Sequence, residues 1–152
     1  MSRMCGMELV LNAPDFNQLD LLEIMLDHGW HPGFEGNITF LPLGDDQDFN
    51  WRGLPQSDWN KVYEILVKKS DAGELVGVNL TWKDTNIGGT FHFESDGEGK
   101  KIWTSWYANR PLLPDCEWLT DHGWFIKRIT PAFQKAGIHI EHVGTGANEF
   151  RT

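Results

Sequence analysis

The stretch GGTFHFESDGEGKKIWTSWY, residues 88–107, decides the fold. Phe91 and Phe93 fall on one face of an extended segment, whereas His92 and Glu94 fall on the other. After the polar residues 95–99, whose two glycines favour a turn, the same alternation returns. The stretch therefore predicts a β-hairpin, with Ile102, Thr104 and Trp106 on one face of its second strand and Trp103, Ser105 and Tyr107 on the other.

Length and composition predict one globular domain covering residues 1–152. The chain is long enough to bury a core without disulfides, 40% of its residues are hydrophobic, and eight Trp and nine Phe supply large side chains. We expect residues 1–6 and 144–152 to be mobile termini.

The charge of the chain restricts its partners. Thirteen Lys and Arg against 22 Asp and Glu give a formal net charge of -9, which repels phosphate backbones. Direct nucleic-acid binding is therefore disfavoured, and a positively charged protein partner is favoured. No apolar run approaches the roughly 20 residues that span a bilayer, so we expect no membrane association.

The N-terminal region and the cysteines predict a cytoplasmic location. The apolar run at residues 7–11 is too short for the core of an export signal. Cys5 and Cys116 lie far apart and outside any CxxC pair, which favours two reduced thiols over a disulfide framework.

The remaining elements follow from apolar periodicity and from helix start and stop residues. Trp30 to Gly33 is predicted as a turn, Ser57 as a helix N-cap, and Pro131 as the start of a second, short helix capped by Thr130. The predicted strands cover residues 7–11, 38–41, 75–82 and 138–143, and the predicted helices cover residues 15–27, 58–69 and 115–136.

The resulting order is β-α-β-α-β-β-β-α-β, in which three successive strands joined by short turns must be antiparallel neighbours. We therefore predict an α+β fold: a single domain with an antiparallel or mixed sheet of about five to six strands and helices mainly on one face. Phe91, Phe93, Ile102 and Trp106 are the predicted core of the hairpin.

One tetrad occurs twice. Asp27-His28-Gly29-Trp30 recurs as Asp121-His122-Gly123-Trp124, but the flanking sequences share nothing. A single pair is not a repeat architecture, and we expect the two copies to have different structural roles.

No catalytic, metal or nucleotide motif stands out. His28/His31 and His139/His142 are each three residues apart, but the first pair straddles a glycine and the second lies in a predicted strand, where that spacing places them on opposite faces. Combinations such as Cys116 with His122 and Asp121, or Ser105 with His92, match no family signature. We therefore expect no metal, no cofactor and no enzyme activity.

Acidic residues near aromatic residues form the predicted binding surface. Aromatic side chains are enriched at interface hot spots, and acidic side chains around them favour a basic partner. The predicted partner-binding residues are Asp45, Asp46, Asp48, Trp51, Glu94, Asp96, Glu98, Trp103 and Tyr107.

In general character the chain resembles the immunity proteins of bacterial polymorphic and contact-dependent toxins, on the residues 45–51 and 94–98. The resemblance implies a small acidic cytosolic inhibitor that occludes a basic, nuclease-like toxin domain. We expect the chain to be a monomer or a small homo-oligomer. Two alternatives stay open. One is a hydrolase-like enzyme that uses His92 or His122 with neighbouring carboxylates, and the other is a sugar- or ligand-binding module that uses Trp103 and Tyr107.

Overall fold

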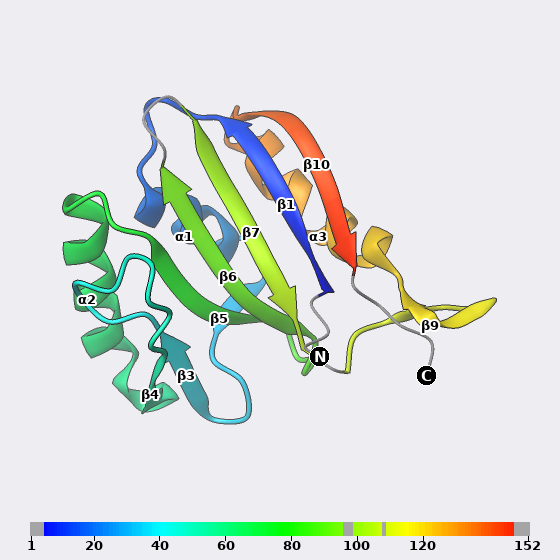
Figure 1. Cartoon of the computed structure of the whole chain (residues 1–152), viewed down its shortest axis with the longest axis horizontal. Helices are drawn as coiled ribbons and strands as arrows, with labels where there is room; N and C mark the ends of the chain where they lie inside the picture. Colours follow the sequence, from blue (N-terminus) through cyan, green and yellow to red (C-terminus); the bar gives the residue numbers. More distant parts are fainter. Residues whose placement is uncertain (1–4, 96–98, 108, 148–152) are drawn as a thin grey trace.

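The computed structural model describes residues 5–95, 99–107 and 109–147, and in them it has an α+β fold with three helices and one large antiparallel sheet (Figure 1). Seven strands run in the order β10-β1-β7-β6-β5-β3-β4, and β2 pairs separately with β5. The predicted class is confirmed, but the sheet of eight strands is larger than predicted. Its strands are β1 (Cys5–Asn12), β2 (Trp30–Pro32), β3 (Asn37–Phe40), β4 (Arg52–Pro55), β5 (Val76–Trp82), β6 (Gly88–Ser95), β7 (Lys100–Trp106) and β10 (His139–Ala147).

The predicted hairpin is confirmed as β6 and β7. Phe91 lies opposite Thr104 and Phe93 opposite Ile102, so the predicted core residues share one face of the sheet. Phe91, Phe93, Ile102 and Trp106 are all buried there. The alternation in the sequence therefore assigned both faces of this hairpin.

The first strand lies inside the sheet because it pairs on both sides. β1 is antiparallel to β7 and to β10, with Leu9 opposite Ile102 and opposite Val143. Residues 5–6 and 144–147, which we expected in mobile termini, instead pair with each other, for example Cys5 with Ala147.

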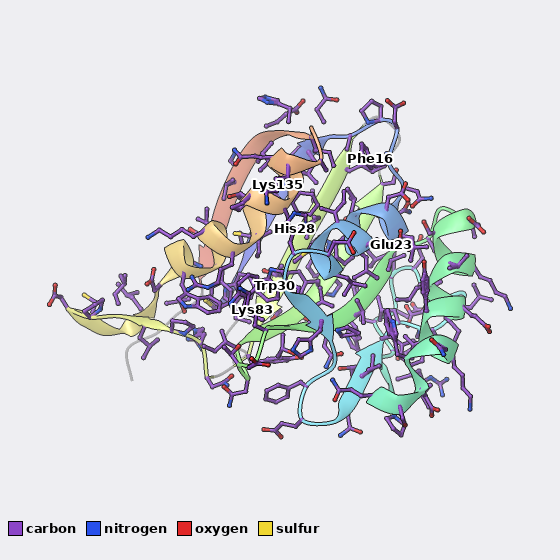
Figure 2. All side chains as sticks on the ribbon, turned by 180° about the vertical axis from the view of Figure 1, so that it is seen from behind. Phe16, Glu23, His28, Trp30, Lys83 and Lys135 are labelled. Carbon is purple, nitrogen blue, oxygen red and sulfur yellow. The ribbon has the colours of Figure 1, made fainter. Side chains whose placement is uncertain are left out.

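Helices α1 (Gln18–Leu26) and α3 (His122–Lys135) cover one face of the sheet, and α2 (Trp59–Asp71) lies beside it. Asn17 caps α1 through a capping box with Asp20, so the helix begins at Gln18, three residues later than predicted. Figure 2 shows the molecule from this covered side, with the fully buried Trp30 labelled near its centre. The Trp30 indole donates a hydrogen bond to the Arg128 carbonyl of α3, at 3.0 Å, and so ties β2 to the helical layer.

The predicted turn at Trp30 to Gly33 is wrong, because residues 30–32 form β2. Trp30 lies opposite Trp82 of β5, and its ring packs edge-on against the rings of Trp82 and Phe91. Burial of a large indole together with strand pairing outweighs the local preference of Pro32 for a turn.

The predicted last helix, residues 115–136, is also wrong, both in where it starts and in its division at Pro131. Cys116–Thr120 forms strand β9, which pairs with β8 (Leu112–Leu113) in a small separate hairpin, and α3 begins only after the N-cap Asp121. Pro131 lies inside α3 and does not divide it. Thr130 does not cap a second helix, because its hydroxyl donates to the Ile126 carbonyl one turn earlier.

Helix α2 starts differently from the prediction as well. A short 3₁₀ turn, Gln56–Asp58, leads into it, and neither this turn nor the N-cap Asp58 has a side-chain capping bond. The predicted N-cap Ser57 lies within that turn.

The two copies of the repeated tetrad have different roles, as expected. Asp27 is the C-cap of α1, whereas Asp121 is the N-cap of α3 and accepts a hydrogen bond from the backbone N–H of Trp124. Gly29 has a φ of 100°, a conformation that favours glycine, whereas Gly123 lies in a helix.

Candidate functional site

The face of the sheet opposite α1 and α3, here called the open face, carries no helix (Figure 1). Along β7 the residues alternate between buried and half-buried, and the half-buried ones, such as Trp103 and Ser105, lie on this face. Glu94 of β6 and Glu8 of β1 lie on the same face, because Glu8 is opposite Trp103 in the register. The open face therefore presents polar groups and one large indole.

Residues 42–51, here called the acidic loop, lie beside the centre of the open face, and a buried lysine fixes the base of this loop. The side chain of Lys69 in α2 is fully buried. Its ammonium donates to the carbonyls of Pro42 and Asp45, at 2.9 and 2.7 Å, and to Glu74 Oε1 at 3.0 Å. Because a buried charge without partners is very unfavourable, these three acceptors explain how Lys69 is tolerated.

Asp45 is used inside the loop. It is buried, and its carboxylate accepts hydrogen bonds from the backbone N–H groups of Asp48, Phe49 and Asn50, at 2.7 to 3.0 Å. Burial by itself raises the pKa of Asp45, but these three donors and the charge of Lys69 outweigh it, so that the pKa lies below its ordinary value. The expected partner-binding acid thus lies inside the loop, where it orders the backbone.

The other residues of the acidic loop face outward. Asp46 is exposed and accepts a hydrogen bond from the backbone N–H of Leu75 at 2.7 Å, while Asp48 is exposed too. Leu43 and Phe49 are 53% and 42% exposed, which is unusual for large apolar side chains. The loop therefore presents carboxylates and apolar groups together on a backbone held from within.

The loop meets the sheet in an aromatic cluster, which consists of Phe49, Trp51, His92 and Trp103. The His92 and Trp103 rings are stacked, with centroids 3.4 Å apart and planes at 3°. Phe49 packs edge-on against both rings, and Trp51 packs edge-on against His92, with centroid distances of 5.3 to 6.0 Å. Such contacts fix the orientation of Trp103, the central indole of the open face.

His92 is neutral at physiological pH. Burial lowers its pKa to about 4, although the hydrogen bond to the Trp103 carbonyl, at 3.1 Å, acts in the opposite direction. Since a carbonyl only accepts, His92 Nδ1 carries the proton. An uncharged imidazole that stacks on Trp103 and packs edge-on against Phe49 and Trp51 has the features of a packing residue.

Gly77 of β5 provides the space that brings the loop onto the sheet. A Cβ atom at Gly77 would lie 2.7 Å from Leu41 Cδ1 and 3.0 Å from Trp51 Cη2. Leu41 and Trp51 bracket the acidic loop, so this glycine allows both ends to approach the strand. The sequence contains Gly77 in an alternating strand, but nothing in the pattern indicates which side chains cover it.

The structure separates the remaining predicted residues. Tyr107 packs on Phe34, with centroids 4.5 Å apart, and burial raises its pKa to about 12. Tyr107 lies four residues after Trp103, a distance of roughly 13 Å along an extended strand. The two rings therefore do not form one continuous binding surface. Glu94 does adjoin Trp103, because its Oε2 accepts a hydrogen bond from Trp103 Nε1 at 3.2 Å. Asp96 and Glu98 lie outside the described residues.

The structure brings His122 near a cysteine that the combinations drawn from the sequence did not include. His122 Nε2 lies 3.9 Å from the buried Sγ of Cys5, which is itself 3.1 Å from Thr120 Oγ1. His92 bonds to the Trp103 carbonyl, and no bond to Ser105 is seen among the described side chains. In the part of the chain that the structure describes, no three His, Cys, Asp or Glu side chains gather closely enough to hold a metal ion.

Comparison of the chain with protein-family models, with curated proteins and with solved structures found no match. Across the described residues, no helix has both the length and the apolar character needed to cross a membrane. The acidic loop and the aromatic cluster beside it are thus the candidate functional site on geometric grounds.

Proposed function

We propose that this chain is a small acidic inhibitor of the immunity or antitoxin type, which occludes a basic, nuclease-like toxin domain in the bacterial cytoplasm. The observation that carries the proposal is the acidic loop, in which the exposed apolar groups of Leu43 and Phe49 lie among the exposed carboxylates of Asp46 and Asp48. Buried apolar side chains supply most of the binding affinity of an interface, and the surrounding charges increase its specificity and association rate.

The order within the loop supports the same function. Binding costs less free energy when a surface is already in its bound conformation. The bonds of Lys69 to the loop carbonyls and of Asp45 to three backbone N–H groups hold the backbone before any partner arrives. The net charge of -9 adds long-range attraction toward a basic domain.

The mode of action is coverage of the toxin. A loop beside an open sheet face presents a broad, mostly shallow surface, and a surface of this kind inhibits by blocking access to the active site. Lys101 of β7 lies on the open face, where it is paired with Glu8 at 3.3 Å. Repulsion of a basic partner there is therefore small.

The experiment uses an inactivated toxin domain encoded beside the gene for this chain, and it measures the association rate by stopped-flow fluorescence. We expect the rate to fall at least about tenfold between low and high salt. Asp48→Asn should lower the rate at low salt, whereas the matched control Asp84→Asn, an exposed acid in the turn between β5 and β6, should change it less. Absence of binding, or a rate that salt leaves unchanged, contradicts the proposal.

A further inference from the structure

A hollow of about 490 Å³ lies between the acidic loop and the hairpin, and the proposed function does not by itself assign it an occupant. Asp46 and Phe49 line it from the loop, and Glu94 and Trp103 line it from β6 and β7. Gly73 and Leu75, which follow α2, also line it, and Gln47 and Ser95 complete its wall. Two aromatic rings and two carboxylates thus surround one space.

We infer that this hollow receives an arginine side chain of the toxin partner, an inference that rests on the proposed function and names the group recognised. A guanidinium is flat, stacks on aromatic faces and donates several N–H groups in a fixed plane. Carboxylates within the same space accept those N–H groups in charge-assisted bonds. The four lining groups therefore match both properties of one side chain.

The two carboxylates are positioned in advance, each by one of its oxygens. Glu94 Oε2 accepts from the Trp103 indole, and Asp46 Oδ1 accepts from the backbone N–H of Leu75. Glu94 Oε1 and Asp46 Oδ2 make no hydrogen bond to any residue that the structure describes. Each acid therefore keeps one acceptor oxygen for an incoming donor.

Lys101 and Lys69 are each paired with an acid other than Asp46 and Glu94. Lys101 lies opposite Glu94 in the hairpin register, but its ammonium contacts Glu8. Lys69, at the base of the loop, contacts Glu74. The negative charge of Asp46 and Glu94 is thus not neutralised by these two lysines.

Trp103 is fixed as one wall of the hollow. Its ring is stacked on the neutral His92 and is held at its edge by Phe49, while its Nε1–H is held by Glu94. A ring that does not have to be reoriented loses little conformational entropy on binding. This favours recognition of a single planar cation over a flexible apolar group.

The test titrates the isotopically labelled protein with N-acetyl-arginine N-methylamide and follows the indole N–H resonance of Trp103, assigned with a Trp103→Phe variant. We expect a saturable shift with a dissociation constant in the millimolar range, on the order of 1–10 mM for so small a probe. The neutral citrulline analogue should cause no saturable shift, and the lysine analogue should bind at least about threefold more weakly.

Glu94→Gln is the decisive variant, since its amide oxygen still accepts from Trp103 while the charge is removed. We expect arginine binding to weaken at least about fivefold, as charge-assisted bonds are roughly twice as strong as neutral ones. The matched control Asp84→Asn, an exposed acid in the turn between β5 and β6, should leave arginine binding unchanged. Equal binding of arginine and citrulline, or unchanged binding by the Glu94→Gln protein, overturns the inference.

The same variants separate this inference from the proposed function. A toxin domain that binds the wild-type and Glu94→Gln proteins equally well, with a salt-dependent rate, supports inhibition and overturns the arginine site. Arginine binding that depends on Glu94, with no toxin binding, supports the site and overturns inhibition of a toxin.

Discussion

The two faces of the β6–β7 hairpin differ in what they contact, although their residues alternate along the same strands. On the covered side Phe91 and Phe93 are fully buried beneath the helical layer, and Phe91 packs edge-on against Trp30 and Trp106. On the open side Trp103 is half-buried, stacks on His92 and donates a hydrogen bond to Glu94. One hairpin therefore stabilises the fold with one set of side chains and presents a site with the other.

Side chains of this hairpin are therefore buried by two different kinds of neighbour. The covered face is buried by whole helices, so its residues are part of the general core. His92 on the open face is buried by a single loop and one strand neighbour. Substitutions on the covered face should therefore affect global stability, and those on the open face should affect binding or the local arrangement of the loop.

The largest expected effect is that of Phe91→Ala. Removal of a fully buried phenyl ring leaves a cavity among Trp30, Phe93 and Trp106, and we expect the free energy of unfolding to fall by about 4 kcal/mol. Urea denaturation followed by circular dichroism measures it. Trp103→Ala is the control on the open face and should cost about 1 kcal/mol, because its ring is partly solvated already. A loss as large as that for Phe91→Ala would show that both faces are core.

Lys69→Met tests whether the acidic loop is held from within. The thioether keeps the length of the side chain but leaves the carbonyls of Pro42 and Asp45 and the carboxylate of Glu74 without their donor. We expect a loss of about 3 kcal/mol together with faster amide hydrogen exchange at Asn50. The neighbouring exposed Lys68→Met should change neither quantity. Unchanged exchange at Asn50 would mean that the loop is ordered without the lysine.

The smallest effect is a pH dependence from His92. The pKa of about 4 in the folded protein lies below the roughly 6.5 of an unfolded chain, so the unfolded state takes up the proton first as the pH falls. The stabilising contribution is complete above about pH 6.5 and should decrease by about 2 kcal/mol by pH 5. Denaturation of wild-type and His92→Phe proteins at pH 7 and pH 5 measures it, and the variant should lose less stability than the wild type. Equal losses would contradict a neutral, buried His92.

The predictable parts of the fold are the segments whose own residues carry the pattern of a strand or a helix. Alternation along Gly88–Ser95 and Lys100–Trp106 assigned both strands and their buried faces, because a strand repeats every two residues. Residues 30–32 and 116–120 were assigned wrongly because their strand partners lie elsewhere, at Trp82 in one case and at Leu112 in the other. Pairing of this kind overrides local preference and leaves little trace in the segment itself.

The residue types of the candidate site were visible in the sequence, but the contacts among them were not. Acidic and aromatic residues at 45–51 were visible in the sequence, and Trp103 and Glu94 do lie beside them. The interior position of Asp45 was not visible, because it depends on three backbone N–H groups folding around one carboxylate. The buried position of Lys69 was not visible either, since two of its acceptors come from a loop more than 20 residues earlier.

The position of β1 has a consequence for how the protein is made. β1 precedes both of its partners, β7 and β10, in the chain, so Leu9 is synthesised before Ile102 and Val143, the residues opposite it in the sheet. Pairings so distant in sequence form slowly. During synthesis Met7, Leu9 and Leu11 therefore stay without their native strand neighbours until β7 and β10 have emerged.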